Sequence, residues 1–203
     1  MNQEDFIKKR DFLYHLTDKD NLAKIISEKK ILSTETIVNR SSLEDTLKQA
    51  FLSERRKRHE TIRIGTEIYK IRDQKPISVV NLVKCLTKGV SVSDFFRLLN
   101  SRVFFWPTLK RLQSHYNRYS HEHPVIIKVS TKEILELNKQ VEFCRLNSGA
   151  TRSNSYLNGA PPSRGEGTFL PAVDFKHSIG NVAEVTFPDY CVLPGILFIG
   201  DNP

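Results

Sequence analysis

The feature that most constrains the fold is a set of short apolar runs of strand length, separated by turn residues and helical patterns. The run VIIKVS at 125–130 has the pattern of a buried strand, TKEILEL after it predicts a short helix, and VEFCRL at 141–146 predicts another strand. Near the end of the sequence, NVAEVTF at 181–187 and GILFIG at 195–200 predict two further strands. Strands mixed with helices in this irregular order predict an α+β fold with a mixed or antiparallel sheet.

The first half of the chain carries both kinds of pattern. Residues 11–17 predict a strand that leads directly into a helix. A capping box near residues 41–45 predicts a second helix that runs to about Arg58. Extended structure at 62–71 and a helix over about 77–87 are expected next.

Three boundaries are expected between this region and the apolar run VIIKVS. Ser93 is expected to cap the helical run DFFRLLN, Arg102 to begin a strand, and Pro107 to open a further helix. A loop is expected from about 147 to 177, because its first part is rich in Ser, Asn, Gly, Pro and Arg. With 203 residues the chain is expected to form one domain, 1–203.

The compartment is predicted from cysteines and from hydropathy. Cys85, Cys144 and Cys191 are widely spaced and lack a CxxC pattern, so we expect reduced, mostly buried thiols rather than disulfides or a thiolate metal site. The polar start and the lack of an 18-residue apolar run predict neither a signal peptide nor a membrane span. A cytoplasmic protein is the expectation.

The net charge of +8 is concentrated in the middle of the chain. Residues 48–118 carry 16 Lys or Arg against 5 Asp or Glu, whereas acidic residues slightly exceed basic ones on either side. A basic block of this kind suits a polyanionic partner such as nucleic acid. For the densest run, Arg55 to Arg58, a solvated helix face is the alternative.

Two charged residues stand in apolar surroundings. Glu184 interrupts a strongly apolar strand pattern, where an unpaired carboxylate is costly to bury. It belongs either to a cleft with a chemical function or to a solvent-facing edge strand. Arg102, in LLNSRVFFW, either binds an anionic partner such as carboxylate or pyrophosphate, or lies at the surface.

Histidines allow several interpretations. His15 lies between apolar residues of the first predicted strand, in a structural or a functional role. Arg118 and His123 have the R-x4-H spacing of helical ribonucleases of the HEPN class, but Pro124 and a strand follow directly. No carboxylate or further histidine completes a metal set with the histidines near residue 120, so no metal is expected.

The segments together resemble a known family. The opening YHLTDKDNLAKII is similar to the start of DarT-type ADP-ribosyltransferases. LLNSRVFFW resembles their Asn-x-Arg strand, and VAEVTF resembles the late strand with their catalytic glutamate. The patterns RDQKPI, NSGAT and RGEGTF, at 72–77, 147–151 and 164–169, are similar to those of an uncharacterised DarT relative. The region before the Asn-x-Arg strand is longer and more basic than in DarT itself, which indicates a basic helical insertion at about 40–95.

The resemblance implies an ADP-ribosyltransferase-like sheet core with flanking helices, and NAD as co-substrate. It implies that Glu184 is catalytic, bonding the ribose 2′-hydroxyl, and that Arg102 holds the pyrophosphate or orients the nicotinamide ribose. The loop at 147–177 would act as a lid, with Arg164 as a phosphate contact; a disordered insertion is the alternative. The residues expected to line the NAD pocket are Tyr14, His15, Thr17 and Asn21.

The resulting hypothesis is that the protein is an NAD-dependent ADP-ribosyltransferase that modifies nucleic acid, DNA or RNA. Arg55, Arg56 and Arg58 are expected among its substrate contacts. One alternative is an RNA 2′-phosphotransferase of the same fold group, which also consumes NAD. Another is a non-catalytic nucleic-acid-binding module. The resemblance also allows an antitoxin or an ADP-ribosyl hydrolase as a partner protein.

Overall fold

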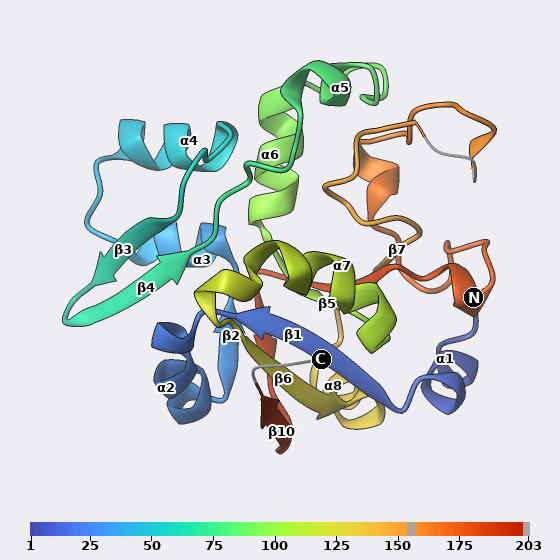
Figure 1. Cartoon of the computed structure of the whole chain (residues 1–203), viewed down its shortest axis with the longest axis horizontal. Helices are drawn as coiled ribbons and strands as arrows, with labels where there is room; N and C mark the ends of the chain where they lie inside the picture. The colour runs from blue at the N-terminus through green and yellow to red at the C-terminus, as the bar shows by residue number, and fades with distance from the viewer. Residues whose placement is uncertain (154–156, 201–203) are drawn as a thin grey trace.

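Three antiparallel strands form one side of the molecule (Figure 1). In the computed structural model, which describes residues 1–153 and 157–200, they lie in the order β1-β6-β10. These strands are β1 (Phe12–Thr17), β6 (Val125–Ser130) and β10 (Ile196–Gly200). The apolar run VIIKVS therefore forms the central strand, and it is buried on both faces, because Ile127 and Val129 pack in the main core while Ile126 packs with Leu112 on the opposite face.

A second antiparallel sheet has the order β5-β8-β7. Its strands are β5 (Arg102–Phe105), β8 (Glu184–Pro188) and β7 (Glu142–Cys144). The two sheets are joined where Tyr14 and Trp106 exchange main-chain hydrogen bonds of 3.0 and 2.8 Å. The α+β prediction is confirmed, and the described pairings between strands are antiparallel.

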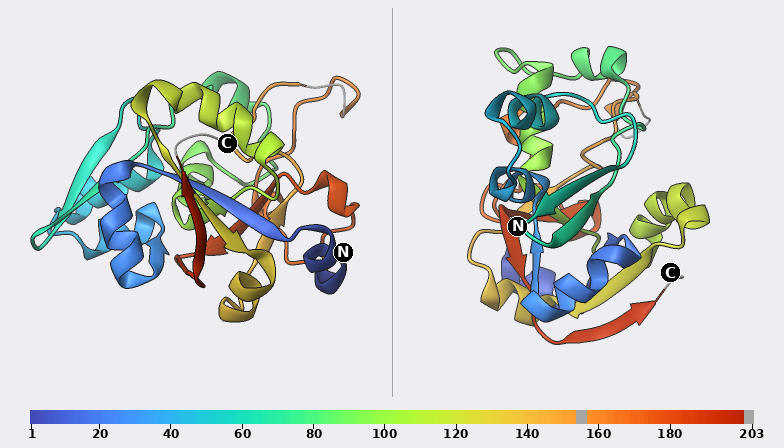
Figure 2. Two further views of the ribbon diagram at one scale, coloured as in Figure 1. Left: turned by 60° about the horizontal axis from the view of Figure 1, so that its bottom comes forward. Right: turned by 90° about the vertical axis from the view of Figure 1, so that its left-hand side faces the viewer.

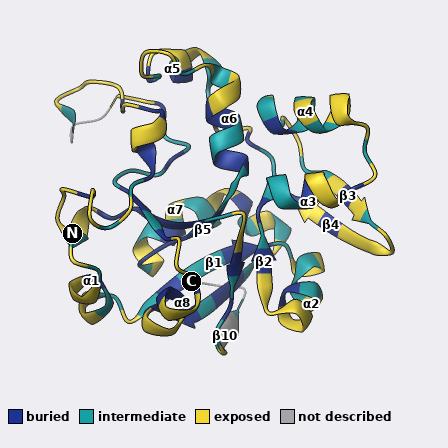
Figure 3. Cartoon of the chain, turned by 180° about the vertical axis from the view of Figure 1, so that it is seen from behind, coloured by how far each residue is buried: buried dark blue, intermediate teal, exposed yellow. Residues whose placement is uncertain are grey.

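The main core lies between these two sheets. Leu13 and Ile127 from the first sheet pack in one cluster with Phe105, Val185 and Phe187 from the second, and all five are 0% exposed. The helices α1 (Gln3–Lys9) and α8 (Thr131–Leu137) add Phe6, Ile134 and Leu135 to it. Figure 3 shows the buried residues concentrated on the strands, with exposed residues along the outer helices.

Residues 34–100, which include the range 40–95 predicted as a basic insertion, form a second layer above the sheets, on the side away from α8 (Figures 1 and 2). It contains a β-hairpin as well as helices, with its own apolar cluster that includes Val38, Leu52 and Ile71. The elements here are α3 (Thr34–Arg40), α4 (Asp45–Ser53), β3 (Glu60–Ile64), β4 (Glu67–Ile71), α5 (Val79–Val83) and α6 (Val92–Asn100).

Several predicted boundaries in this layer are wrong. The helix expected to reach Arg58 ends at Ser53, because Glu54 has an extended backbone. The residues after Glu54 are not helical, so the interpretation of the basic run as a solvated helix face is also wrong. Ser91, not Ser93, caps α6, in a capping box with Asp94.

The remaining elements follow the predicted order. Asp18 caps α2 (Lys19–Glu28), and Thr108 caps α7 (Leu109–Tyr119), one residue after the proline expected to open this helix. Two short strands that the sequence did not indicate, β2 (Lys30–Leu32) and β9 (Tyr190–Val192), pair with each other.

The predicted loop at 147–177 contains neither α-helix nor β-strand in its described residues; positions 154–156 lie outside them. The three cysteines are buried and free, as expected. Within residues 1–153 and 157–200, no helix has the length and apolar character needed to cross a membrane.

Candidate functional site

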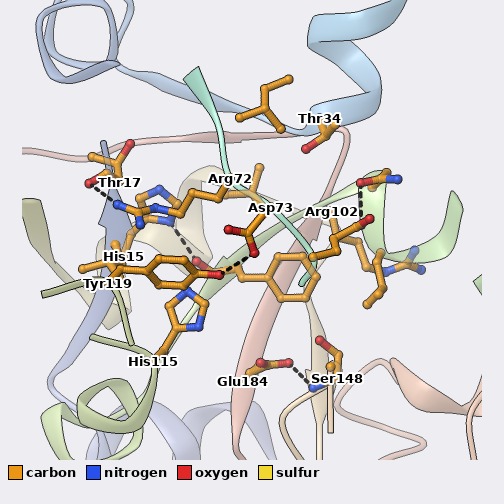
Figure 4. Close-up of a pocket in the computed structure, with 18 of the residues that line it drawn as sticks. His15, Thr17, Thr34, Arg72, Asp73, Arg102, His115, Tyr119, Ser148 and Glu184 are labelled. Atoms are coloured by element: carbon orange, nitrogen blue, oxygen red, sulfur yellow. Dashed lines mark hydrogen bonds between the residues drawn. The ribbon is translucent and has the colours of Figure 1, made fainter. Parts of the chain in front are cut away.

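A cavity of about 720 Å³ opens between the two sheets and the layer above them. Cavities of about 300–1,000 Å³ are typical of sites for small molecules and cofactors. Figure 4 shows polar and aromatic side chains from strands, from α7 and from the segment after β7 converging on it. The polar and titratable lining residues include His15, Thr17, Asn21, Arg72, Asp73, Arg102, His115, Arg118, Tyr119, Ser148, Arg152 and Glu184.

Glu184 provides a carboxylate in this cavity. It is the first residue of β8, the central strand of its sheet, and is 5% exposed, so the interpretation as a solvent-facing edge residue is wrong. Its Oε2 accepts a hydrogen bond of 2.9 Å from the main-chain N–H of Ser148. Burial raises the pKa of Glu184 to about 7, against the opposing effects of the Ser148 hydrogen bonds and the charge of Arg164. Such a carboxyl group can gain or lose a proton near neutral pH.

His15 on β1 lines the same cavity as Glu184. Its Nδ1 lies 2.8 Å from the carbonyl oxygen of Phe104, and its ring packs against Phe105. A carbonyl only accepts, so Nδ1 carries the proton and Nε2 is left as an acceptor. Burial and, to a smaller extent, the nearby charge of Arg72 lower the pKa of His15 to about 4, against the opposing effect of the hydrogen bond to Phe104. The imidazole is therefore neutral at pH 7.

Of the other three residues expected around the NAD pocket, Thr17 and Asn21 line the cavity, whereas Tyr14 packs in the core. Thr17 lines the cavity, and its carbonyl oxygen accepts from Arg72 at 3.3 Å. Asn21 also lines it, but its amide is bound to both main-chain groups of Lys70, at 2.8 and 2.9 Å, and so docks α2 on β4. Tyr14 packs against the cluster around Trp106, and we assign it to the core.

The guanidinium of Arg102 is bound by protein groups. Its Nε and Nη2 bind both carboxylate oxygens of Glu142, at 2.6 and 3.1 Å, and its Nη1 donates to Leu98 O and Ser101 Oγ. In register, Arg102 pairs with Pro188, four residues from Glu184 along β8, so their main chains lie about 13 Å apart at the usual rise per residue. Arg102 lines the same cavity as Glu184, but its guanidinium is bound to Glu142 and not to Glu184.

Arg164 is also held by protein groups. It is 3% exposed, and its guanidinium donates to the carbonyl oxygens of Asn147 and Ala150. The guanidinium holds the main chain beside Glu184, and this replaces the expected phosphate contact.

The three arginines of the basic run have different surroundings. Arg55 donates to the carbonyl oxygens of Gln74 and Lys75. Arg56 donates to Asn100 Oδ1 at 2.8 Å, and burial lowers its pKa to about 10. The side chain of Arg58 is 85% exposed and lies 3.1 Å from Glu60. Arg58 alone of these three keeps the exposed position that a nucleic-acid contact requires.

The sequence did not point to a further arginine of the cavity, Arg72. Arg72 follows β4 directly, and its guanidinium binds Glu122 Oε2 at 3.2 Å and Thr17 O, with its carbon atom Cζ 4.7 Å from the ring centre of Tyr119. Its Nε is buried and has no hydrogen-bond partner among the described residues. This unpaired donor and its positive charge suit an anionic ligand group.

Aromatic residues of α7 form the wall beside Arg72 (Figure 4). The hydroxyl of Tyr119 donates to Asp73 at 3.2 Å, and burial raises the pKa of Tyr119 to about 12. His115 stacks on Trp106 with ring centres 4.8 Å apart, and burial lowers its pKa to about 3. The recurrence of His115 and Tyr119 at four-residue spacing places both on one helix face, a signal that the sequence does carry.

His59 connects the basic layer to this wall. Its Nδ1 accepts from the main-chain N–H of Asp73 at 2.9 Å, so its proton lies on Nε2, which is 2.7 Å from Glu122 Oε1. The same carboxylate binds Arg72. His59 thus binds the main chain of Asp73 and the carboxylate of Glu122, which in turn binds Arg72.

The rival ribonuclease pattern is not placed on a single helix. Arg118 belongs to α7, whereas His123 follows a separate 3-10 turn and has a left-handed backbone. In the described parts of the chain, no group of three or more His, Cys, Asp or Glu residues is arranged to hold a metal ion.

Fold and cavity together define an α+β protein with two three-stranded antiparallel sheets and a pocket that contains a buried carboxylate and a neutral imidazole. The chain belongs to DUF7002, a family of unknown function whose model matches residues 11–190. That range contains β1, α7 and β8, which position the site. Comparisons with curated proteins and with solved structures gave no match.

Proposed function

We propose that this protein is a cytoplasmic NAD-dependent ADP-ribosyltransferase. The observation that carries the proposal is the presence of Glu184, His15 and Arg72 in one cavity of dinucleotide size. The segments YHLT and VAEVTF resemble DarT segments, and this resemblance implies that His15 lines the NAD pocket and that Glu184 is catalytic. The three free cysteines agree with a reducing compartment.

Unpaired polar atoms in the lining support a polar ligand. Trp106 Nε1, Asn147 Oδ1 and Arg72 Nε are buried and lack hydrogen-bond partners within the described structure. Buried groups of this kind usually have a partner, and a missing one points to a ligand or water. They offer donors for phosphate oxygens and an acceptor for a hydroxyl or amide group, all of which NAD carries.

Each site residue then has a defined task. When bound, NAD would supply the ADP-ribosyl group. The bond between ribose C1′ and the nicotinamide nitrogen would break, and nicotinamide would be the leaving group. Glu184 accepts from the ribose 2′-hydroxyl, stabilises positive charge that develops at C1′, and takes the proton of the acceptor nucleophile as that group bonds to C1′. His15 Nε2 accepts from a further hydroxyl, and Arg72 binds the diphosphate.

Nucleic acid is the acceptor class that we propose, and charge supports it. The excess of basic residues lies in 48–118, and that range includes Arg118, which is exposed and lines the cavity. Arg152, also exposed, lines the cavity from the segment after Ser148. Both guanidiniums can meet a phosphate backbone at the place where the acceptor must enter.

The test is incubation of the protein with NAD, with and without DNA or RNA oligonucleotides, and detection of nicotinamide and of the modified oligonucleotide by mass spectrometry. Glu184→Gln is the matched control, since it keeps the shape of the side chain. Absence of NAD consumption under all conditions would favour the non-catalytic nucleic-acid-binding module. Removal of a 2′-phosphate from an RNA oligonucleotide would favour the phosphotransferase instead.

A further inference from the structure

Two sequence motifs, NSGAT and RGEGTF, meet beside Glu184. Arg164, from RGEGTF, donates through Nη2 to Asn147 O at 2.8 Å and to Ala150 O at 2.9 Å, and through Nε to Ala150 O at 3.2 Å. Asn147 and Ala150 belong to NSGAT, and the N–H of Ala150 donates to Asn147 O at 2.8 Å. One guanidinium therefore binds both ends of a tight turn.

That turn carries the hydrogen bond to the carboxylate. Ser148 lies inside it, is 4% exposed, and donates its main-chain N–H to Glu184 Oε2. A shift of the turn moves this donor, because a main-chain N–H has no rotatable bond of its own. The contacts of Arg164 thus determine where the Ser148 N–H points.

The main chain of Arg164 is itself anchored. Its N–H donates to Cys85 O at 2.7 Å, and its carbonyl oxygen accepts from Thr87 N at 2.8 Å. The next residue, Gly165, approaches Thr87 so closely that a Cβ at this position would lie 2.1 Å from Thr87 Oγ1. The guanidinium therefore extends from a fixed base toward the turn.

We propose that Arg164 is a positioning residue for Glu184: it holds the 147–150 turn so that the Ser148 N–H and its own positive charge both favour the ionised carboxylate. That Arg164 positions the carboxylate follows from the hydrogen bonds described above. That this position affects catalysis rests on the proposed function.

Charged and titratable groups around Glu184 come from several elements. Cys144 pairs with it in register on β7, and burial together with the carboxylate raises the pKa of this thiol to about 12. His15 and His115, on the cavity side, have pKa values lowered to about 4 and about 3. Near neutral pH these three groups carry no charge, and Arg164 acts on Glu184 as a cation.

The test uses Arg164→Gln, Arg164→Lys and Ser148→Ala. The pKa of Glu184 is measured by ¹³C NMR of its carboxyl group, assigned with Glu184→Gln, and compared with the acidic limb of the pH profile of nicotinamide release. We expect Arg164→Gln to raise the Glu184 pKa by about one unit or more, because charge and hydrogen bond are both weakened. Arg164→Lys keeps the charge but cannot span both carbonyls, so a smaller rise is expected. Ser148→Ala keeps the N–H but removes the hydroxyl, whose hydrogen bond also lowers the Glu184 pKa, so it should raise this pKa through the loss of that one bond and leave the turn in place.

The control is the double variant Arg102→Gln/Glu142→Gln, which removes a partly buried arginine from the sheet that carries Glu184. It should lower stability without moving the Glu184 titration. An unchanged titration in both Arg164 variants, or an equal shift in the control, overturns the proposal; if Arg164→Gln does not fold, Arg164→Lys decides it. A wild-type protein that releases no nicotinamide removes the proposed function but leaves the NMR titration as the test.

Discussion

Arg102 and Glu142 form a bidentate ion pair across the central strand β8, with distances of 2.6 and 3.1 Å. The two residues lie on the outer strands β5 and β7, and their side chains are 12% and 21% exposed. The ring of Phe169 covers the guanidinium, with 4.5 Å from Cζ to the ring centre. The pair therefore fastens the sheet from which Glu184 projects.

Replacing Arg102 by Met should lower the free energy of unfolding by about 3–5 kcal/mol, because Glu142 loses its partner in a mostly buried position. Urea denaturation measures this loss. The double variant Arg102→Met/Glu142→Leu should recover part of it. Calorimetry should show little change in NAD affinity, and a large loss of affinity would return Arg102 to the binding site.

Glu184→Gln should abolish nicotinamide release and change how stability depends on pH. The folded pKa of Glu184, about 7, exceeds the ordinary value of 4.5, so its contribution to stability is present below pH 4.5 and is lost as pH rises through 7. The wild type should lose about 3 kcal/mol over this range through Glu184. The amide cannot ionise, so thermal denaturation of the variant should lack this loss. A mutant with wild-type turnover would contradict the catalytic role.

The sequence marks Glu184, because a carboxylate inside VAEVTF conflicts with its local pattern. It also predicts β6 and α8, whose apolar spacing suffices to define them. At the basic run the prediction is wrong, because local propensity favours a helix there. The chain there is held outside the helix by distant contacts: Arg56 binds Asn100, which also binds Gln74 and the carbonyl of Leu52.

Arg72 was missed for a related reason. It follows EIYKI, in which charged and apolar residues alternate as on any exposed strand, and its partner Glu122 lies 50 residues away. Arg102 was misassigned because an arginine in apolar surroundings needs an anion, and the sequence does not show that Glu142 supplies it. Local patterns thus indicate that a charge is buried, whereas tertiary contacts decide its partner.

Arg72→Met should weaken NAD binding by about tenfold to a hundredfold, the usual effect of losing a charge-assisted hydrogen bond. Calorimetry with Glu184→Gln as the background avoids turnover during the measurement. Arg58→Met removes an equal charge from an exposed position and should leave the affinity unchanged. Equal affinities in both variants would assign Arg72 to structure alone.

His115→Phe should improve stability in acid. The pKa of His115 is lowered to about 3 by burial, so its contribution to stability is present above pH 6.5 and is lost as pH falls through 3. Phenylalanine keeps the stacking on Trp106 and takes up no proton on unfolding. The difference in melting temperature between variant and wild type should therefore grow in the variant's favour from pH 7 to pH 4. A constant difference would mean that His115 is not held neutral by burial.

We expect nucleic acid to contact the cavity mouth, formed by the exposed lining residues Arg118 and Arg152, rather than the basic run. In the basic run, Arg55 and Arg56 are bound to protein groups. Arg118→Gln/Arg152→Gln should weaken oligonucleotide binding and reduce the slope of log affinity against log salt by about 1.4–1.8, since each phosphate contact contributes about 0.7–0.9. Fluorescence anisotropy between 50 and 200 mM salt measures both effects. The control Lys84→Gln/Lys88→Gln removes the same charge from exposed positions near α5. Equal slopes for the two double variants would show that nonspecific charge, and not the cavity mouth, attracts nucleic acid. A protein or a small molecule would then be the better candidate for the acceptor.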